Sequence, residues 1–157
     1  MQKYQTEIEQ YGQSTLVVPI PMKIADDLLA EGHRRIIVHI DGQQFHCAIH
    51  HRKARGYFVY FGKQASRQLG IYKGEKIEVG IEADRSRYQA PLPEEFEAVI
   101  STDADAMEAF ESLPPGKKRS LLFSVHRLKN VDSRIDKSLR ICENLKIGFT
   151  DLNRLQK

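Results

Sequence analysis

Residues 18–40 and 59–81 carry the same residue pattern, and this internal repeat limits the possible folds of the chain more than any other feature. A shift of 41 positions places five apolar residues of the first copy on apolar residues of the second: Val18 on Val59, Leu28 on Leu69, Ile36 on Ile77, Val38 on Val79 and Ile40 on Ile81. Each copy predicts a strand, a short helix, a turn and a second strand. One such half-unit cannot easily bury its apolar face alone. The repeat therefore predicts an α+β fold in which two β-α-β half-units close a small pseudo-two-fold β-barrel.

Further strands and turns extend this prediction over residues 1–90. Alternating residues predict a strand over Tyr4–Glu9, and the β-branched run Thr15–Ile20 predicts another. Asp41-Gly42 lies between two alternating apolar segments and favours a two-residue hairpin turn, which would place Val38 opposite Phe45 and Ile36 opposite Cys47. The polar segment His50–Gly56 is typical of a loop.

Residues 91–157 predict a helical tail of three to four short helices that packs on itself or on the barrel. Pro93 and Asp103 are suited to begin the first two helices. The third is predicted over Lys117–Lys129, and Asp132 is expected to cap the fourth. In that last helix the spacing predicts an inward face of four residues: Ile135, Leu139, Cys142 and Leu145.

Composition narrows the class of protein. The chain has no apolar run near the roughly 20 residues that a membrane helix needs, and its first residues lack the layout of a signal peptide. We therefore expect a cytoplasmic protein with no membrane insertion, present as a monomer or weak homodimer. Cys47 and Cys142 lie far apart in apolar segments, which favours two buried free thiols over a disulfide.

Charge is segregated in the tail, although the net charge of the whole chain is only +3. Residues 92–112 carry seven acids and no base, whereas residues 117–140 carry eight bases and two acids. The basic block could form a surface for nucleic acid or an acidic partner. We favour the alternative that the acidic and basic helices pack together and pair their charges.

Two parts of the chain resemble known families. The stretch Leu69–Ile77 resembles the LG-x-x-x-G-[DE]-x-[VI] segment of swapped-hairpin, AbrB-like barrels. Together with the first repeat, it resembles the bacterial domain of unknown function 1905. In the tail, the segments Leu92–Phe96, Ala109–Pro115 and Leu128–Ile135 resemble the YdeI/OmpD-associated, bacteriocin-protection family. The resemblance implies an AbrB-like double-split β-barrel followed by that family's tail, and a role in resisting antimicrobial peptides.

The tail departs from the family pattern at several positions. The family usually has a tryptophan in the third helix, and this chain has none. Ser133 stands where threonine is usual, and Asp136-Lys137 stands where a second arginine is common. Lys129 and Arg134 do match the family motif, and they are candidates for an anion or acidic-partner site. The alternative is that they pair with acids across the helices, among them Glu94, Glu95, Glu97 and Asp105.

Four histidines are the main candidates for metal ligands. His39 and His46 are expected to be diagonal neighbours on the outer face of a hairpin, and His50-His51 follow. With no carboxylate or thiolate evident to complete a site, we favour solvent-facing histidines without a metal.

Basic loop residues are the candidates for a nucleic-acid surface. The segment Arg52-Lys53-Ala54-Arg55 could contact phosphates, with Tyr57 and Tyr60 available for stacking, and Arg34-Arg35 lie in the matching loop of the first copy. The outer residues of the two copies differ, which argues against reading of a two-fold operator.

No catalytic constellation is evident. Ser124 and His126 lie two residues apart on a predicted helix and point to different faces, so they do not form a triad with Asp132. We expect no cofactor and no enzymatic activity. The leading hypothesis is a non-enzymatic interaction module with an unknown protein partner, linked through its family resemblance to envelope or antimicrobial-peptide stress. Nucleic-acid binding is the main alternative, and an enzyme of unknown class is the third.

Overall fold

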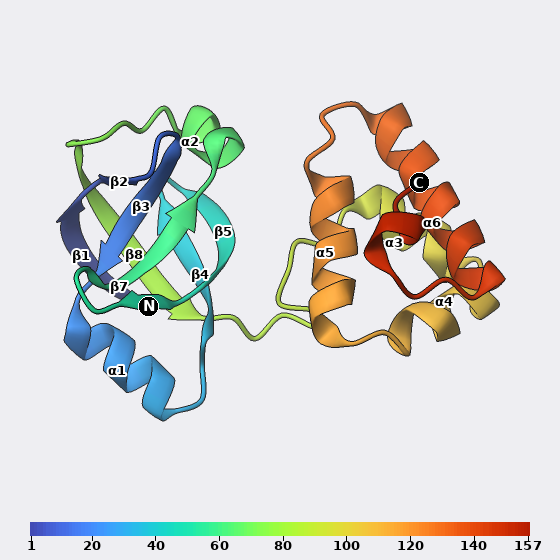
Figure 1. The fold of residues 1–157 in the computed structure, drawn as a ribbon, viewed down its shortest axis with the longest axis horizontal. Helices are drawn as coiled ribbons and strands as arrows, with labels where there is room; N and C mark the ends of the chain where they lie inside the picture. Colours follow the sequence, from blue (N-terminus) through green and yellow to red (C-terminus); the bar gives the residue numbers. More distant parts are fainter. The chain divides into compact units, whose positions relative to one another are not determined.

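The computed structural model describes residues 1–157, and the chain divides into two compact units, Met1–Arg85 and Ser86–Lys157 (Figure 1). Each unit has its own cluster of buried apolar side chains. No helix is both long and apolar enough to cross a lipid bilayer.

The N-terminal unit consists of eight strands and two helices. In chain order they are β1 (Gln2–Glu7), β2 (Glu9–Tyr11), β3 (Thr15–Ile20), α1 (Met22–Ala30), β4 (Arg35–Ile40), β5 (Gln43–Ala48), β6 (His50–Arg52), β7 (Gly56–Phe61), α2 (Lys63–Leu69) and β8 (Lys76–Ala83). The strands form two antiparallel four-stranded sheets, β1-β8-β4-β5 and β2-β3-β7-β6. The predicted α+β class is confirmed, but the sheets are not joined into one closed, hydrogen-bonded barrel. Helices α1 and α2 lie at opposite ends of this unit (Figure 1).

The strand register contains the pseudo-two-fold axis that the repeat predicts. Val18 of β3 pairs directly with Val59 of β7, and His39 of β4 pairs directly with Gly80 of β8. Both pairs join residues 41 positions apart (59 − 18 and 80 − 39), which is the repeat offset. When a residue pairs with its own repeat equivalent, the symmetry axis passes between the two residues. The axis that relates the copies therefore runs through the centre of the β3–β7 pair and of the β4–β8 pair.

The repeat is longer than its apolar pattern indicates. Adding 41 to β1 gives residues 43–48, which are β5, and adding 41 to β2 gives residues 50–52, which are β6. The segment expected to be a loop, His50–Gly56, thus begins with a strand, because β7 supplies the backbone partners for His50 and Arg52. Each copy contains five elements instead of three, in the order β-β-β-α-β.

The two copies exchange strands. The first strand of each copy pairs with the last strand of the other, β1 with β8 and β5 with β4. The exchange is symmetric down to single backbone bonds: the amide of Ile8 donates to Glu75 O at 2.8 Å, and that of Ile49 donates to Arg34 O at 2.9 Å. Ile49 is the repeat equivalent of Ile8, and Glu75 is the repeat equivalent of Arg34, since 41 positions separate the members of each pair. The copies are therefore interleaved in the sheet, not placed side by side.

The core of this unit lies between the two sheets. Ile36, Val38 and Val79 are buried in one cluster, and Ile77 packs against it, as predicted. The hairpin register is also confirmed, with Val38 opposite Phe45 and Ile36 opposite Cys47.

The C-terminal unit consists of five helices, one more than the sequence predicts. They are α3 (Glu94–Ser101), α4 (Ala104–Glu111), α5 (Pro115–His126), α6 (Val131–Ile147) and α7 (Leu152–Leu155). Asp103 caps α4 through a bond from the Ala106 amide, as predicted. Asn130, not Asp132, caps α6, because the Asn130 side chain accepts from the Ser133 amide.

The inner face of helix α6 is confirmed at Cys142 and Leu145 and differs from the prediction at Ile135 and Leu139. Its buried residues are Ser138, Ile141, Cys142 and Leu145. Ile135 and Leu139, both expected to point inward, are 36% and 49% exposed. The inner face is rotated away from them, since small Ser138 and branched Ile141 occupy the contact with the neighbouring helices instead.

Candidate functional site

His39 and His46 lie on the outer face of the β1-β8-β4-β5 sheet, and each pairs with a carboxylate. His39 Nε2 lies 2.9 Å from Glu82 Oε1, and His46 Nδ1 lies 2.6 Å from Asp84 Oδ2. The Asp84 side chain is fully buried, so it needs a partner to offset the loss of hydration. Nothing in the sequence indicates these two carboxylates, since both acids come from the far end of the second copy. No group of three or more metal-ligating side chains converges anywhere in the chain.

The two thiols are buried and unpaired, as predicted. Burial, followed by the Asp84 charge, raises the pKa of Cys47 to about 12, although the nearby Arg35 acts in the opposite direction. Burial likewise raises the pKa of Cys142 to about 11. Because the thiolate is the nucleophilic form, neither sulfur is activated near neutral pH.

Ser124 is not placed as a nucleophile. Its side chain is buried, and its hydroxyl donates to Leu121 O at 2.6 Å, one helical turn back. The hydroxyl therefore satisfies a backbone carbonyl within α5.

Arg134, one of the two tail residues that match the family motif, stabilises the junction between α5 and α6. Its Nε donates to Leu128 O at 2.6 Å and its Nη2 to His126 O at 3.2 Å, at the end of α5. Its Nη1 lies 3.6 Å from Glu95 Oε1 on α3, as the pairing alternative predicts. Lys129, the other match, is exposed, and no contact ties it to Arg134.

Three of the predicted basic residues come together around His50 on the other sheet. Burial lowers the pKa of His50 from its ordinary value, and the charges of Arg34, Arg52 and Arg35 lower it further. Arg34 reaches this place because its carbonyl bonds the Ile49 amide, next to His50. The structure thus brings the basic residues of the two copies to one surface.

The remaining two basic candidates are placed differently. Arg55 donates to Glu9 Oε2 at 3.0 Å and to Gln10 O at 2.9 Å, and its guanidinium lies 5.3 Å from the centre of the Tyr11 ring. Lys53 is exposed in the turn between β6 and β7. Arg55 therefore holds the Tyr11 ring in position, whereas Lys53 lies in the exposed β6–β7 turn.

Aromatic rings share this surface with the arginines. Tyr60 lies 4.7 Å from His50 and 5.5 Å from Tyr11, measured between ring centres. Because Val59 belongs to the core, strand alternation places Tyr60 on the outer face of the β2-β3-β7-β6 sheet. We call this surface the arginine–aromatic face and define it by Tyr11, Arg34, His50, Arg52 and Tyr60. Tyr57, also considered for stacking, instead donates to Asp26 at 2.8 Å.

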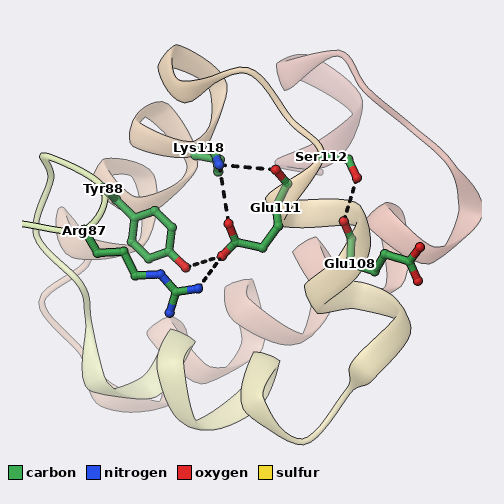
Figure 2. A network of polar contacts seen from close by, with 6 residues as sticks. All are labelled: Arg87, Tyr88, Glu108, Glu111, Ser112 and Lys118. Atoms are coloured by element: carbon green, nitrogen blue, oxygen red, sulfur yellow. Dashed lines mark hydrogen bonds and ion pairs between the residues drawn. The ribbon is translucent and has the colours of Figure 1, made fainter.

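A polar network in the C-terminal unit has no clear signal in the sequence. Glu111 of α4 accepts from the Tyr88 hydroxyl at 2.5 Å and from Arg87 Nη2 at 3.0 Å, and its other oxygen lies 3.5 Å from Lys118 Nζ of α5 (Figure 2). Burial, and then the bond to Glu111, raises the pKa of Tyr88 to about 12. The Tyr88 bond and the nearby cations lower the pKa of Glu111. The network links residues 87–88 to two helices, and its groups are occupied by one another.

Charge pairing across helices accounts for part of the segregated tail. Lys118 pairs with Glu111, Arg134 with Glu95, and Lys146 with Asp103 at 2.9 Å. These contacts join the basic and acidic helices, as we favoured from the sequence.

Three exposed apolar residues of the C-terminal unit form a row on α6. Val131, Ile135 and Leu139 are 57%, 36% and 49% exposed and follow one another at four-residue spacing. Residues at this spacing lie along one side of a helix. We call this row the α6 ridge.

Comparison with protein families gives two matches. Residues 89–148 match the family described as "Bacteriocin-protection, YdeI or OmpD-Associated", and residues 4–81 match a domain of unknown function, DUF1905. The first match contains the α6 ridge and the second contains the arginine–aromatic face. No curated protein matches the chain.

Proposed function

Because residues 89–148 match the YdeI or OmpD-associated, bacteriocin-protection family and residues 4–81 match the domain of unknown function 1905, we propose that the chain protects against antimicrobial peptides by binding, without catalysis. The α6 ridge is the observation that carries this proposal. Its occupant is a cationic amphipathic helix, the form that many antimicrobial peptides adopt.

The side chains with reactive groups support a role in binding over one in catalysis. The pKa values of both buried thiols are raised by burial, and the Ser124 hydroxyl is bonded within its own helix. These groups contribute to the packing and hydrogen bonding of the fold.

The geometry of the ridge suits a helical partner. Its three apolar side chains are spaced one turn apart, so a second helix lying along α6 can contact all of them with its own apolar side. Large apolar residues in a contiguous exposed row are typical of interaction sites, whereas single exposed ones are ordinary.

Charge along the ridge selects a cationic partner. Asp132 and Asp136 follow Val131 and Ile135 directly in sequence, so the edge beside the first two ridge residues is acidic. Beside the third, Leu139, the following residue is Arg140, and Glu143 further along is paired with Lys146 at 2.8 Å. Asp132 and Asp136 are exposed and make no ion pair. Lysine or arginine residues that flank the apolar side of a bound helix would lie against this acidic edge.

The test measures binding of a designed amphipathic helix, made only of leucine and lysine, to the full chain by isothermal titration calorimetry. We expect the peptide to bind, and we expect the double variant Ile135→Gln/Leu139→Gln to weaken binding at least about tenfold, or 1.4 kcal/mol. Asp136→Asn should weaken binding less, and its effect should shrink as salt is added.

Two controls make the result specific. Ile147→Gln removes another exposed apolar residue of α6 that lies outside the ridge and is 66% exposed, and it should leave binding unchanged. A peptide of the same composition in scrambled order has no apolar side and should not bind. Equal binding of the scrambled peptide, or an equal loss in Ile147→Gln, would contradict the proposal.

A further inference from the structure

We propose that the arginine–aromatic face of the N-terminal unit binds single-stranded nucleic acid. This inference concerns the other unit of the chain and does not depend on peptide binding at the α6 ridge. It rests on three observations: the rings, the unpaired cations beside them, and the chemical difference between the two repeat copies at this face.

The rings form an aromatic cluster at this face. Tyr60 is half-buried at its centre, with the Tyr11 ring 5.5 Å away and inclined by 71° and the His50 ring 4.7 Å away and inclined by 60°. Tyr11 is 40% exposed, and the Arg55 guanidinium lies over its ring, 5.3 Å from the ring centre. Stacking on such rings tolerates any base, because every base has a π-face.

The cations are available to phosphates. Arg34 and Arg52 are exposed, and neither makes an ion pair. Arg52 lies two residues from His50 on β6, and Arg34 O accepts from the amide of Ile49, so both residues lie next to the rings. By contrast, the guanidinium of Arg55 is paired with Glu9. A strand whose bases stack on Tyr60 would therefore bring its phosphates to Arg34 and Arg52.

The face lacks the chemical two-fold symmetry that a palindromic duplex site requires. The repeat equivalents of His50 and Arg52 are Glu9 and Tyr11, since each lies 41 positions earlier. One half of the face therefore presents an imidazole and a guanidinium where the other half presents a carboxylate and a phenol. Recognition of a duplex by two like surfaces does not fit this arrangement, whereas a single strand needs only a charged track and rings.

The binding test uses the full chain and a fluorescently labelled oligothymidylate of roughly 16 nucleotides, the upper end of typical site sizes. Fluorescence anisotropy should report binding that weakens as salt rises. The double variant Arg34→Gln/Arg52→Gln should bind less tightly, and its logarithmic salt slope should be shallower by about 1.4, or 0.7 for each phosphate that the variant no longer neutralises.

Substitutions of Tyr60 test the stacking. Tyr60→Ala should weaken binding by about 5- to 150-fold, the range expected for loss of one stacked base, whereas Tyr60→Phe should retain most of it. Circular dichroism of each variant identifies any loss of fold, and the folded Tyr60→Phe protein keeps the test informative if Tyr60→Ala unfolds.

Charge-matched controls come from the other sheet of the same unit. Lys3→Gln/Lys76→Gln removes two exposed positive charges from β1 and β8 and should leave the affinity within about twofold, because surface charges far from a site are largely screened. An equal loss in this control would show non-specific attraction and overturn the proposal.

Anionic ligands without bases test whether binding depends on the bases as well as on charge. Vesicles of phosphatidylglycerol and a poly-glutamate chain carry anionic groups without bases, and both should bind more weakly than the oligonucleotide. The proposal is overturned if either binds as tightly, if a DNA duplex of equal length binds as tightly, or if no oligonucleotide binding occurs at low salt.

Discussion

Arg134 holds three backbone and side-chain groups at the end of α5 and on α3, through its bonds to Leu128 O and His126 O and its contact with Glu95. The last carbonyls of a helix have no partners within that helix, and a cation near them also interacts favourably with the helix dipole. The residue that matches the family motif thus has a structural task in this chain.

We expect Arg134→Leu to lower the free energy of unfolding by about 1–3 kcal/mol, because it leaves polar groups at the α5–α6 junction without their donor. Glu95 would suffer most, since its Oε2 is already buried without a hydrogen-bond partner. Urea denaturation followed by circular dichroism measures the change.

Lys129→Leu is the matched control for this prediction. It removes the neighbouring cation of the same motif from an exposed position, and it should change stability by no more than about 0.5 kcal/mol. Equal effects of the two substitutions would contradict the structural role of Arg134.

Residue types alone could not predict the partners of the histidines. His39 and His46 were placed correctly on the outer hairpin face, because strand alternation is local. Their partners Glu82 and Asp84 lie 43 and 38 positions away, so they could be found only from the pairing of β4 with β8.

At the scale of elements, the central hairpin depends on a backbone conformation that few residues adopt. Asp41 and Gly42 have φ values of 49° and 74° in the two-residue turn between β4 and β5. Both values are in the left-handed region, and the twist of such a turn matches that of the paired strands.

Gly42→Ala should therefore destabilise the protein by about 1–2 kcal/mol, the cost of a Cβ in the left-handed region. A Cβ at Gly42 would meet no neighbouring atom, so strain of the backbone is the only expected cause. Gly116→Ala is the control: that glycine lies in α5 without a positive φ, a Cβ there would meet only the end of the Arg119 side chain at 3.9 Å, and its substitution should not destabilise the protein. Thermal unfolding of both variants measures the difference.

Sequence patterns predicted β1 and β5 as strands but did not show that they are equivalent parts of the repeat. Val18, Val38, Val59 and Val79 face one core, so the copies retained matching apolar residues there. Edge strands β1 and β5 are only half-buried, and their sequences, QKYQTE and QQFHCA, share only a glutamine at the first position and an aromatic ring at the third. The buried face of helix α6 could not be predicted from its apolar pattern either. Ile135 and Leu139 fit that pattern as well as Ile141 does, but only Ile141 is buried.

At the scale of the whole molecule, the chain is two units with separate cores, which predicts that each folds alone. We expect the fragments Met1–Arg85 and Ser86–Lys157 each to unfold cooperatively in urea. Circular dichroism and fluorescence should give coincident transitions for each fragment.

Division of the chain within the first unit should have the opposite result. A cut between Asp41 and Gly42 separates the two repeat copies, and each isolated copy lacks the strand that the other supplies to it. Neither piece should fold by itself, although an equimolar mixture can reassemble. A folded isolated copy would contradict the strand exchange.

The pairing of β1 with β8 also has a consequence for how the protein is made. Gln2 emerges from the ribosome long before Ile81, its partner, has been translated. At about 5–20 residues per second, the first strand waits several seconds without its neighbour. The N-terminal unit must therefore complete its folding only after its last strand is released, and during that interval an aggregation-prone nascent segment is open to chaperones.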